Sequence, residues 1–229
     1  MDGLAEYAIS DGVASVTMDD GKVNALSLEM LGAVTGLFDR AEDDGAEAVV
    51  LSGREGVFSA GFDLKTEDEG WPPMLIAGAS LAARMLSFPR PVIIACNGHA
   101  MAMGGFLLLS ADYRVGASGD FNIGLNEVAI GLTMPWFGIE IARHRLTRPY
   151  FDRCAVTGVL LGPDEAKTAG FLDRVVAGPE LAGSAREAAV ALAQVKDPAH
   201  AQTKLRVREQ VIAGVRDGIR RIEGDGREW

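Results

Sequence analysis

The sequence predicts an α/β fold with a largely parallel sheet. Short apolar segments at Ala48–Leu51 and Val92–Ala95 are typical of strands that are buried on both faces. Stretches with apolar residues at helical spacing separate these segments. Strands that alternate with helices need crossover connections, and such connections join parallel strands.

The first residues predict a hairpin followed by a helix. Apolar and polar residues alternate over Tyr7–Met18 around the turn dipeptide Asp11-Gly12, which is a strong hairpin signal. After an irregular loop at Lys22–Leu26, Ser27 is suited to be the N-cap of a helix that continues to about Asp43. The expected apolar face of this helix consists of Leu28, Leu31, Val34, Leu37, Phe38 and Ala41.

The middle of the chain predicts a strand that feeds an apolar helix. An acidic loop and a helix precede the strand at Val92–Ala95, a small-residue loop and the apolar helix follow it, and another strand comes next. These segments are Thr66–Pro73, Met74–Leu86, Asn97–Met103, Gly104–Ser110 and Asp112–Val115. Because the first N–H groups of a helix have no intrahelical acceptor, they favour negative charge at this junction.

The last third of the chain is rich in helices. They are expected at Pro135–Arg145, Tyr150–Thr157, Asp164–Ala169, Pro179–Gln194 and Pro198–Arg221, with a short strand near Leu172–Val176. We expect a smaller layer that docks on the first unit or on a neighbouring subunit.

Composition excludes several classes of function. The 229 residues carry a net charge of −10, which argues against nucleic acid as the main partner. Only Cys96 and Cys154 are present, as expected for a reduced cytoplasmic protein without a zinc site. The first residues are acidic and lack the apolar run of a signal peptide, so we expect none. The uncharged segment Val92–Ala111 contains Asn97, His99 and three glycines, so we expect a strand, loop and helix and no membrane span.

Three features could carry chemistry: the turn at Ser59–Leu64, the turn at Met103–Gly105, and Glu127. Each has an ordinary structural explanation, as a tight turn, a close packing contact or a solvated carboxylate. Their joint occurrence in this order is the informative observation.

The order F-S-A-G-F-D-L, then N-G-x-A with G-G and an apolar helix ending in A-D-Y-R, then L-N-E-V-A-I-G resembles the crotonase (enoyl-CoA hydratase/isomerase) superfamily. The resemblance covers about Ala8 to Val176. It implies a ββα spiral core over residues 1–176 and a C-terminal helical oligomerisation region over residues 177–229. It also implies an acyl-CoA thioester substrate, no separate cofactor or metal, and a homotrimer or a hexamer built as a dimer of trimers.

The resemblance further implies an oxyanion hole made of two backbone N–H groups, those of Phe62 and Met103. Donors held in place stabilise the negative charge that develops on a thioester oxygen when the neighbouring carbon loses a proton. The family usually has Gly where this chain has Ala102 and Met103. If the backbone there has positive φ, Met103 is strained.

Coenzyme A is expected along the backbone of Ala60, Asp63 and Leu64, with Ala25 and the rest of the Lys22–Leu26 loop beside it. Lys22 or Lys65 could meet a phosphate, and two solvated lysines are an equal alternative. Phe106 and Trp136 are expected to line the acyl pocket. The basic residues of the last helix could reach CoA phosphates across a subunit interface, although solvated charge is favoured; they are Lys204, Arg206, Arg208, Arg216, Arg220 and Arg221.

The residues at the two carboxylate positions of the family indicate the reaction. Hydration typically uses two carboxylates there, and this chain has Phe106 at the first position and Glu127 at the second. One carboxylate suffices for a 1,3-proton shift, and apolar surroundings would raise its pKa. The amino-acid sequences of these motifs are similar to those of the Δ3,Δ2-enoyl-CoA isomerase branch. This similarity implies that Glu127 moves a proton from C2 to C4.

Two alternatives stay open. The chain could be an enoyl-CoA hydratase of fatty-acid β-oxidation whose second acid is Glu67, Asp68, Glu69 or Glu140. It could also be a non-catalytic acyl-CoA-binding homologue. A serine hydrolase is excluded because no G-x-S-x-G motif occurs.

Overall fold

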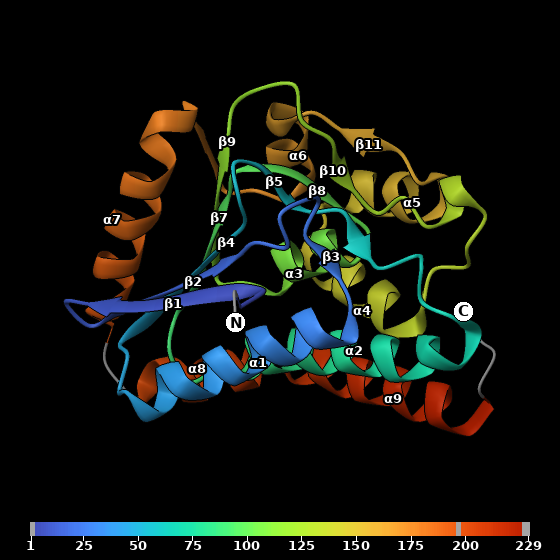
Figure 1. The fold of residues 1–229 in the computed structure, drawn as a ribbon, viewed down its shortest axis with the longest axis horizontal. Helices are drawn as coiled ribbons and strands as arrows, with labels where there is room; N and C mark the ends of the chain where they lie inside the picture. Colours follow the sequence, from blue (N-terminus) through green and yellow to red (C-terminus); the bar gives the residue numbers. More distant parts are fainter. Residues whose placement is uncertain (1–2, 196–197, 226–229) are drawn as a thin grey trace.

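The computed structural model describes residues 3–195 and 198–225. Its largest sheet has the strand order β1-β2-β4-β7-β9-β12, in which β1 and β2 are antiparallel and the remaining neighbours are parallel (Figure 1). The strands are β1 (Ala5–Ser10), β2 (Val13–Met18), β4 (Ala48–Ser52), β7 (Val92–Cys96), β9 (Tyr113–Ala117) and β12 (Arg174–Val176). The predicted α/β class with a largely parallel sheet is therefore confirmed.

Shorter strands form two further sheets. One has the order β11-β10-β8-β5, and the other pairs β3 with β6 in parallel. These strands are β3 (Ala25–Leu26), β5 (Gly56–Ser59), β6 (Gly61–Phe62), β8 (Gly98–Met101), β10 (Ile123–Gly124) and β11 (Leu160–Leu161). The prediction of a loop throughout Asn97–Met103 was wrong, because β8 lies inside it. Strand β8 is held by hydrogen bonds to β5 and β10, which are distant in the chain. The sequence of β8 alone therefore does not identify it as a strand.

The predicted hairpin and first helix are confirmed. Asp11 and Gly12 both have positive φ, as a two-residue hairpin turn of type I′ requires. Helix α1 (Leu28–Asp43) begins after Ser27, whose side chain accepts a hydrogen bond from the Met30 N–H at 3.2 Å. One residue of the predicted apolar face was misplaced: Leu28 is 51% exposed, because the core begins at Met30 in the first turn.

Helix α2 (Trp71–Ser87) begins earlier than predicted. Pro72 and Pro73 stand in its first turn, where a missing N–H leaves no intrahelical hydrogen bond unmade. The remaining helices are α3 (Met103–Ser110), α4 (Trp136–Arg145), α5 (Arg148–Thr157), α6 (Pro163–Ala169), α7 (Leu181–Ala193), α8 (Ala199–Val207) and α9 (Glu209–Asp225). Single 3-10 turns cover Asp68–Gly70, Val128–Ile130 and Gly178–Glu180.

The C-terminal helices pack on the chain's own core. Helix α7 covers one face of the large sheet, where Leu181, Ala185 and Ala189 contact residues such as Ile93 and Val115. Helix α9 packs against α2 and α4 in the helical layer below the sheets (Figure 1). The domain boundary at residue 176 and the oligomerisation role stay predictions. Residues 196–197 and 226–229 of that predicted region lie outside the described residues.

The single helix predicted over Pro198–Arg221 was wrong, since the chain forms α8 and α9 with Arg208 between them. The Arg208 side chain is buried and donates hydrogen bonds to the carbonyl oxygens of Leu86 and Ala111, both at 3.2 Å. This side chain therefore satisfies carbonyl groups at the ends of α2 and α3, which the last turn of a helix leaves without partners. Among the described helices, none combines the length and the apolar character that crossing a membrane requires.

Candidate active site

Two glycine-containing turns lie against each other at the start of α3. Gly61 has φ of +97°, and a Cβ atom added there would lie 2.7 Å from the Cβ of Ala102 and 3.4 Å from the backbone nitrogen of Met103. Only glycine allows this approach. Met103 is the first residue of α3, so its N–H has no acceptor within the helix. The structure thus brings the segment next to Phe62 to the free end of this helix.

The strained residue is Ala102 and not Met103. Ala102 has φ of 49° and ψ of −121°, a region that glycine adopts far more readily than alanine. Its N–H donates to the carbonyl of Gly124 at 3.0 Å, and its carbonyl accepts from the N–H of Phe106 at 3.1 Å. The positive φ that would have strained Met103 falls instead at Ala102, where both backbone groups are hydrogen-bonded.

Glu127 lies in a cavity that also contacts Phe62. The cavity has a volume of about 30 Å³, close to the space of one water molecule. It is lined by Phe62, Trp71, Leu75, Glu127, Leu132, Thr133 and Pro135. The turn at residues 61–62, the start of α2 and the segment at 127–135 therefore meet at one place.

The Glu127 carboxyl is buried, and no charged group of the described residues pairs with it. The residue is 6% exposed, and its Oε2 has no hydrogen-bond partner among the described residues. Burial raises the pKa of Glu127 to about 7, and a hydrogen bond from its own backbone N–H opposes that rise. The carbonyl of Glu127 accepts from the N–H groups of Ile130 and Leu132, which fixes the turn. Such a group can both take and return a proton near neutral pH.

Neither residue predicted for the acyl pocket lines this cavity. Phe106 is fully buried between α3 and α4, where its ring makes an edge contact with Phe137 at a centroid distance of 5.7 Å. Trp136 is 46% exposed, with the guanidinium of Arg221 4.6 Å from the centroid of its ring. Sequence reasoning missed Trp71, Leu75, Leu132, Thr133 and Pro135. No local signal marks Trp71, because the sequence places it in the Thr66–Pro73 loop and only the packing of α2 brings it to the cavity.

The predicted CoA-binding residues lie around the short parallel pair β3 and β6. Ala25 pairs with Gly61 in this ladder, and the N–H of Ala60 donates to the carbonyl of Val23 at 3.0 Å. Leu64, Lys22 and Lys65 are exposed. The Asp63 carboxylate accepts from the N–H of Lys65 at 3.0 Å, which closes the turn after β6.

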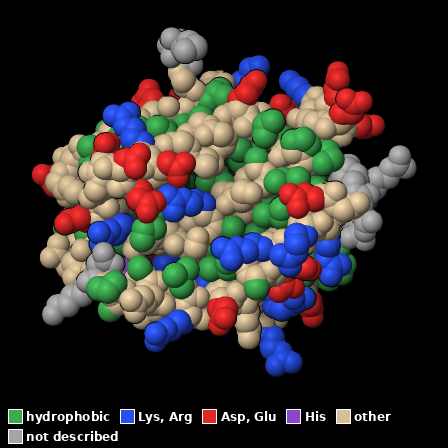
Figure 2. Space-filling model, turned by 90° about the horizontal axis from the view of Figure 1, so that it is seen from below, with side chains coloured by type: hydrophobic (Ala, Val, Ile, Leu, Met, Phe, Trp, Pro, Cys, Tyr) green, Lys and Arg blue, Asp and Glu red, His purple; other side chains and the backbone are tan. Residues whose placement is uncertain are grey.

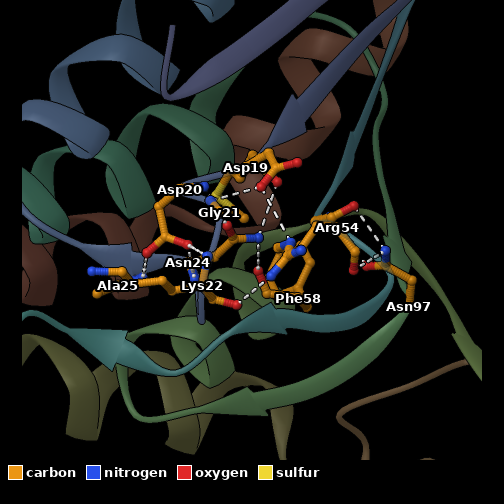
Figure 3. Close-up of polar contacts among 11 residues, drawn as sticks. Asp19, Asp20, Gly21, Lys22, Asn24, Ala25, Arg54, Phe58 and Asn97 are labelled. Carbon is orange, nitrogen blue, oxygen red and sulfur yellow. Dashed lines mark hydrogen bonds and ion pairs between the residues drawn. The ribbon is translucent and has the colours of Figure 1, made fainter. Parts of the chain in front are cut away.

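A hydrogen-bond network that sequence reasoning missed holds the Lys22–Leu26 loop (Figure 3). The Asp20 carboxylate accepts from the N–H groups of Lys22, Asn24 and Ala25 at 2.7, 2.8 and 3.0 Å. Partial burial alone would raise the pKa of Asp20, but these donors hold it below its ordinary value. The guanidinium of Arg54 donates to the carbonyl of Lys22 at 2.8 Å and pairs with Asp19 at 3.2 Å.

The basic residues of the last helices are largely engaged within the chain. The side chains of Lys204 and Arg208 face inward, at 2.6 and 2.9 Å from the Asp112 carboxylate. Burial lowers the pKa of Lys204 to about 8, and Asp112 opposes that effect. Arg220 pairs with Asp217 on α9. Figure 2 shows Lys and Arg interspersed with Asp and Glu on the lower face. The favoured expectation of solvated charge and the alternative of CoA contact both stay predictions.

The alternative acids do not line the Glu127 cavity. Glu67, Asp68 and Glu69 are exposed ahead of α2, and Glu140 pairs with Arg143 on α4. His99 accepts the N–H of Asn122 at its Nδ1 at 3.0 Å, a structural contact. Within residues 3–195 and 198–225, no cluster of His, Cys, Asp and Glu has the form of a metal site.

Known proteins resemble most of the chain. The profile of the enoyl-CoA hydratase/isomerase family matches residues 8–220. Human mitochondrial enoyl-CoA delta isomerase 1 is 31% identical over 214 residues, which are 90% of this chain and 70% of that protein. A carnitinyl-CoA dehydratase from Salmonella enteritidis PT4 is 30% identical over 220 residues, which are 90% of this chain and 84% of that protein.

A solved structure extends the likeness to the fold. The apo structure of an enoyl-CoA isomerase from Mycobacterium tuberculosis matches with a TM-score of 0.95 and 41% identity, covering 98% of this chain and 100% of that one. The likeness confirms the resemblance found in the motifs and the predicted crotonase fold. Together these matches show that the chain belongs to the enoyl-CoA hydratase/isomerase (crotonase) family and is an acyl-CoA-processing protein of that family.

Proposed function

We propose that the protein is a Δ3,Δ2-enoyl-CoA isomerase that uses Glu127 as its only acid/base. The observation that carries the proposal is the single buried carboxyl, with a pKa of about 7, in the cavity that Phe62 also lines. Among the described residues, no second carboxylate lines that cavity. One proton-transferring group suits a 1,3-proton shift better than the addition of water.

In the proposed reaction the thioester oxygen accepts hydrogen bonds from the N–H groups of Phe62 and Met103. Glu127 removes a proton from C2 of the 3-enoyl-CoA, and the C–H electron pair moves into a dienolate whose charge rests largely on that oxygen. Glu127 then delivers the proton to C4. The thioester C=O bond re-forms, a double bond forms between C2 and C3, and the electron pair of C3=C4 makes the new C4–H bond, which gives the 2-enoyl-CoA. Fixed donors at the oxygen and a matched pKa at the base lower the barrier of both steps.

The other parts of the proposal follow the family. Coenzyme A lies along Ala60, Asp63 and Leu64, beside Lys22 and Ala25. Phe106 and Trp136 contribute to the pocket for the acyl group once the substrate is bound. The enzyme needs no separate cofactor, works in the cytoplasm and forms a homotrimer or a dimer of trimers.

A hydratase is the second candidate, and two observations favour it. One relative is described as a carnitinyl-CoA dehydratase, and the Glu127 cavity has room for one water molecule. A hydratase would need a second acid, which substrate binding would have to bring to the cavity. Glu140 is the nearest of the earlier candidates in the chain.

The deciding experiment assays purified protein with a 3-enoyl-CoA and with crotonyl-CoA. We expect isomerisation of the first and slow hydration of the second, with the isomerisation lost in Glu127→Gln. Glu140→Gln is the matched control and should isomerise at the wild-type rate. Fast hydration that survives Glu127→Gln would overturn the proposal, and CoA binding without any turnover would indicate a non-catalytic homologue.

A further inference from the structure

We propose that Ser59 is a positioning residue whose hydroxyl holds the Phe62 and Met103 backbone donors at their working separation. The inference rests on the proposed function, because it assigns a role in stabilising the dienolate oxygen. Ser59 is fully buried at the end of β5, and its side chain does not line the Glu127 cavity. It therefore acts through the backbone and not by touching the substrate.

The Ser59 hydroxyl makes two hydrogen bonds that control the turn before Phe62. It donates to the backbone carbonyl of Asn24 at 2.8 Å and accepts from the N–H of Gly61 at 3.1 Å. Gly61 is the residue with φ of +97°, so the orientation of the following peptide group, which carries the Phe62 N–H, depends on how Gly61 is held. The hydroxyl thus binds the residue immediately before Phe62, whose N–H is the first donor.

Ser59 also lies directly against the second donor's segment. A Cβ atom added at Gly104 would lie 2.7 Å from the carbonyl oxygen of Ser59, 2.9 Å from its Cβ and 3.2 Å from its Oγ. Gly104 follows Met103, whose N–H is the first of α3. Ser59 therefore holds the turn at Gly61 by hydrogen bonds and packs against the first turn of α3.

The partner of this hydroxyl is itself rigidly held. Asn24 is fully buried, and its side-chain nitrogen donates to the carbonyls of Met18 and Phe58 at 3.0 and 3.1 Å (Figure 3). Its side-chain oxygen accepts from the N–H of Asp20 at 3.0 Å. The series Asp20, Asn24, Ser59 and Gly61 therefore links the Lys22–Leu26 loop to the turn that carries the Phe62 N–H.

Removal of the hydroxyl should change the reaction more than the binding of substrate. In Ser59→Ala the N–H of Gly61 and the carbonyl of Asn24 are left buried without this partner, and the turn relaxes to satisfy them. Complete loss of one oxyanion donor typically lowers the rate by about 100- to 1000-fold. A displaced donor should have a smaller effect, about 10- to 100-fold on kcat, with KM changed less than about twofold.

The test compares Ser59→Ala with Ser110→Ala in the full-length enzyme. Ser110 is equally buried, and its hydroxyl donates to the carbonyl of Phe106 at 2.8 Å at the far end of α3. The readouts are kcat and KM for a 3-enoyl-CoA and the dissociation constants of two probes. Acetoacetyl-CoA can bind as an enolate, whereas butanoyl-CoA is a saturated thioester that develops no charge.

We expect Ser59→Ala to weaken acetoacetyl-CoA binding by about the same factor as it lowers kcat, with butanoyl-CoA binding unchanged. Ser110→Ala should match wild type in all four quantities. Ser59→Cys keeps a weaker donor and acceptor and should give an intermediate kcat; it replaces the Ala variant if that variant does not fold.

Three outcomes would contradict these expectations. Wild-type kcat in Ser59→Ala, or in Ser59→Cys where the Ala variant does not fold, overturns the positioning role alone. An equal loss of affinity for both probes does the same. A wild-type protein that neither isomerises a 3-enoyl-CoA nor prefers acetoacetyl-CoA to butanoyl-CoA overturns the proposed function, and the positioning role with it.

Discussion

Two carboxyl groups in this protein are withdrawn from water, and their surroundings differ sharply. The Asp112 side chain is 13% exposed and meets the cations of Lys204 and Arg208 together with the N–H of Val92 at 2.7 Å. Glu127 is about as buried, but among the described residues it has no ion-pair partner and its Oε2 has no hydrogen-bond partner. A compensated charge can hold structure together, whereas an uncompensated one keeps a raised pKa that chemistry can use.

The position of each group in the fold agrees with that difference. Asp112 stands where α3 ends and β9 begins, and Arg208 links it to the carbonyls of Leu86 and Ala111. This cluster joins the C-terminal helices to the core. Glu127 faces a cavity of about 30 Å³ lined mainly by apolar side chains. The contrast between the two regions leads to four predictions.

The largest expected effect is on catalysis, in Glu127→Gln. Loss of the proposed acid/base should lower kcat for 3-enoyl-CoA isomerisation by about 100- to 10,000-fold. The free energy of unfolding at pH 8 should not fall, because the amide removes a buried charge without a partner. Steady-state kinetics and urea unfolding check both halves. A variant that loses stability as well as activity would mean that Glu127 is a structural carboxylate.

Asp112→Asn should have the reverse effect. It leaves the cations of Lys204 and Arg208 without their common counter-ion, and breaking a buried ion pair from one side typically removes about 3–5 kcal/mol of unfolding free energy. The exposed Asp217, which pairs with Arg220 and Arg221, offers a matched control. Asp217→Asn should leave the free energy of unfolding close to the wild-type value, because solvent screens an exposed ion pair. The activity of the Asp112→Asn variant, per folded molecule, should remain at the wild-type level.

The pH dependence of stability separates the two carboxyls further. Glu127 has a folded-state pKa of about 7 against an ordinary value of 4.5, so the folded protein binds its proton more tightly than the unfolded chain does. Its contribution to stability is therefore fully present below pH 4.5 and is lost as the pH rises through 7. A shift of this size corresponds to about 3 kcal/mol.

Urea unfolding of wild type and Glu127→Gln at pH 5 and pH 8 measures this contribution, since the other titrating groups are common to both proteins. From pH 5 to pH 8, the free energy of unfolding of the wild type should fall by about 2–3 kcal/mol relative to that of the variant. Its kcat/KM should fall about tenfold per pH unit well below pH 7, where Glu127 is protonated. An activity that is unchanged down to pH 5 would show that the base titrates elsewhere or with an ordinary pKa.

Local signals in the sequence predicted the elements that local physics determines. The Asp11-Gly12 hairpin and the helix after Ser27 follow from turn and capping chemistry, and the apolar Val92–Ala95 segment follows from burial on both faces. Strand β8 was missed because its partners β5 and β10 supply its hydrogen bonds.

The candidate site shows the same division. The motifs predicted Glu127 and the two glycine turns, whose packing contact the structure shows. They could not place Trp71 and Leu75 in the cavity, because helix packing decides that. The pairing of Asp112 with Lys204, 92 residues later in the chain, also depends on tertiary structure alone.

The smallest expected effect concerns backbone strain, which is also found on the Glu127 side of the comparison. Ala102, next to the proposed Met103 donor, has φ of 49° and ψ of −121°. Ala102→Gly should relieve strain of about 1–3 kcal/mol, offset in part by about 0.5–1 kcal/mol of chain entropy. We expect a net gain of about 1 kcal/mol in urea unfolding, with kcat within about twofold of wild type because the turn keeps its shape.

The control for that gain is Ala100→Gly. Ala100 is equally buried and stands in β8 two residues earlier, but it has ordinary strand geometry. Glycine there relieves no strain and should lose about 0.5–1 kcal/mol. Opposite signs at these two positions would locate the strain in the turn itself. Equal losses would mean that the Ala102 methyl group, packed against Gly61, contributes more to stability than its unfavourable φ removes.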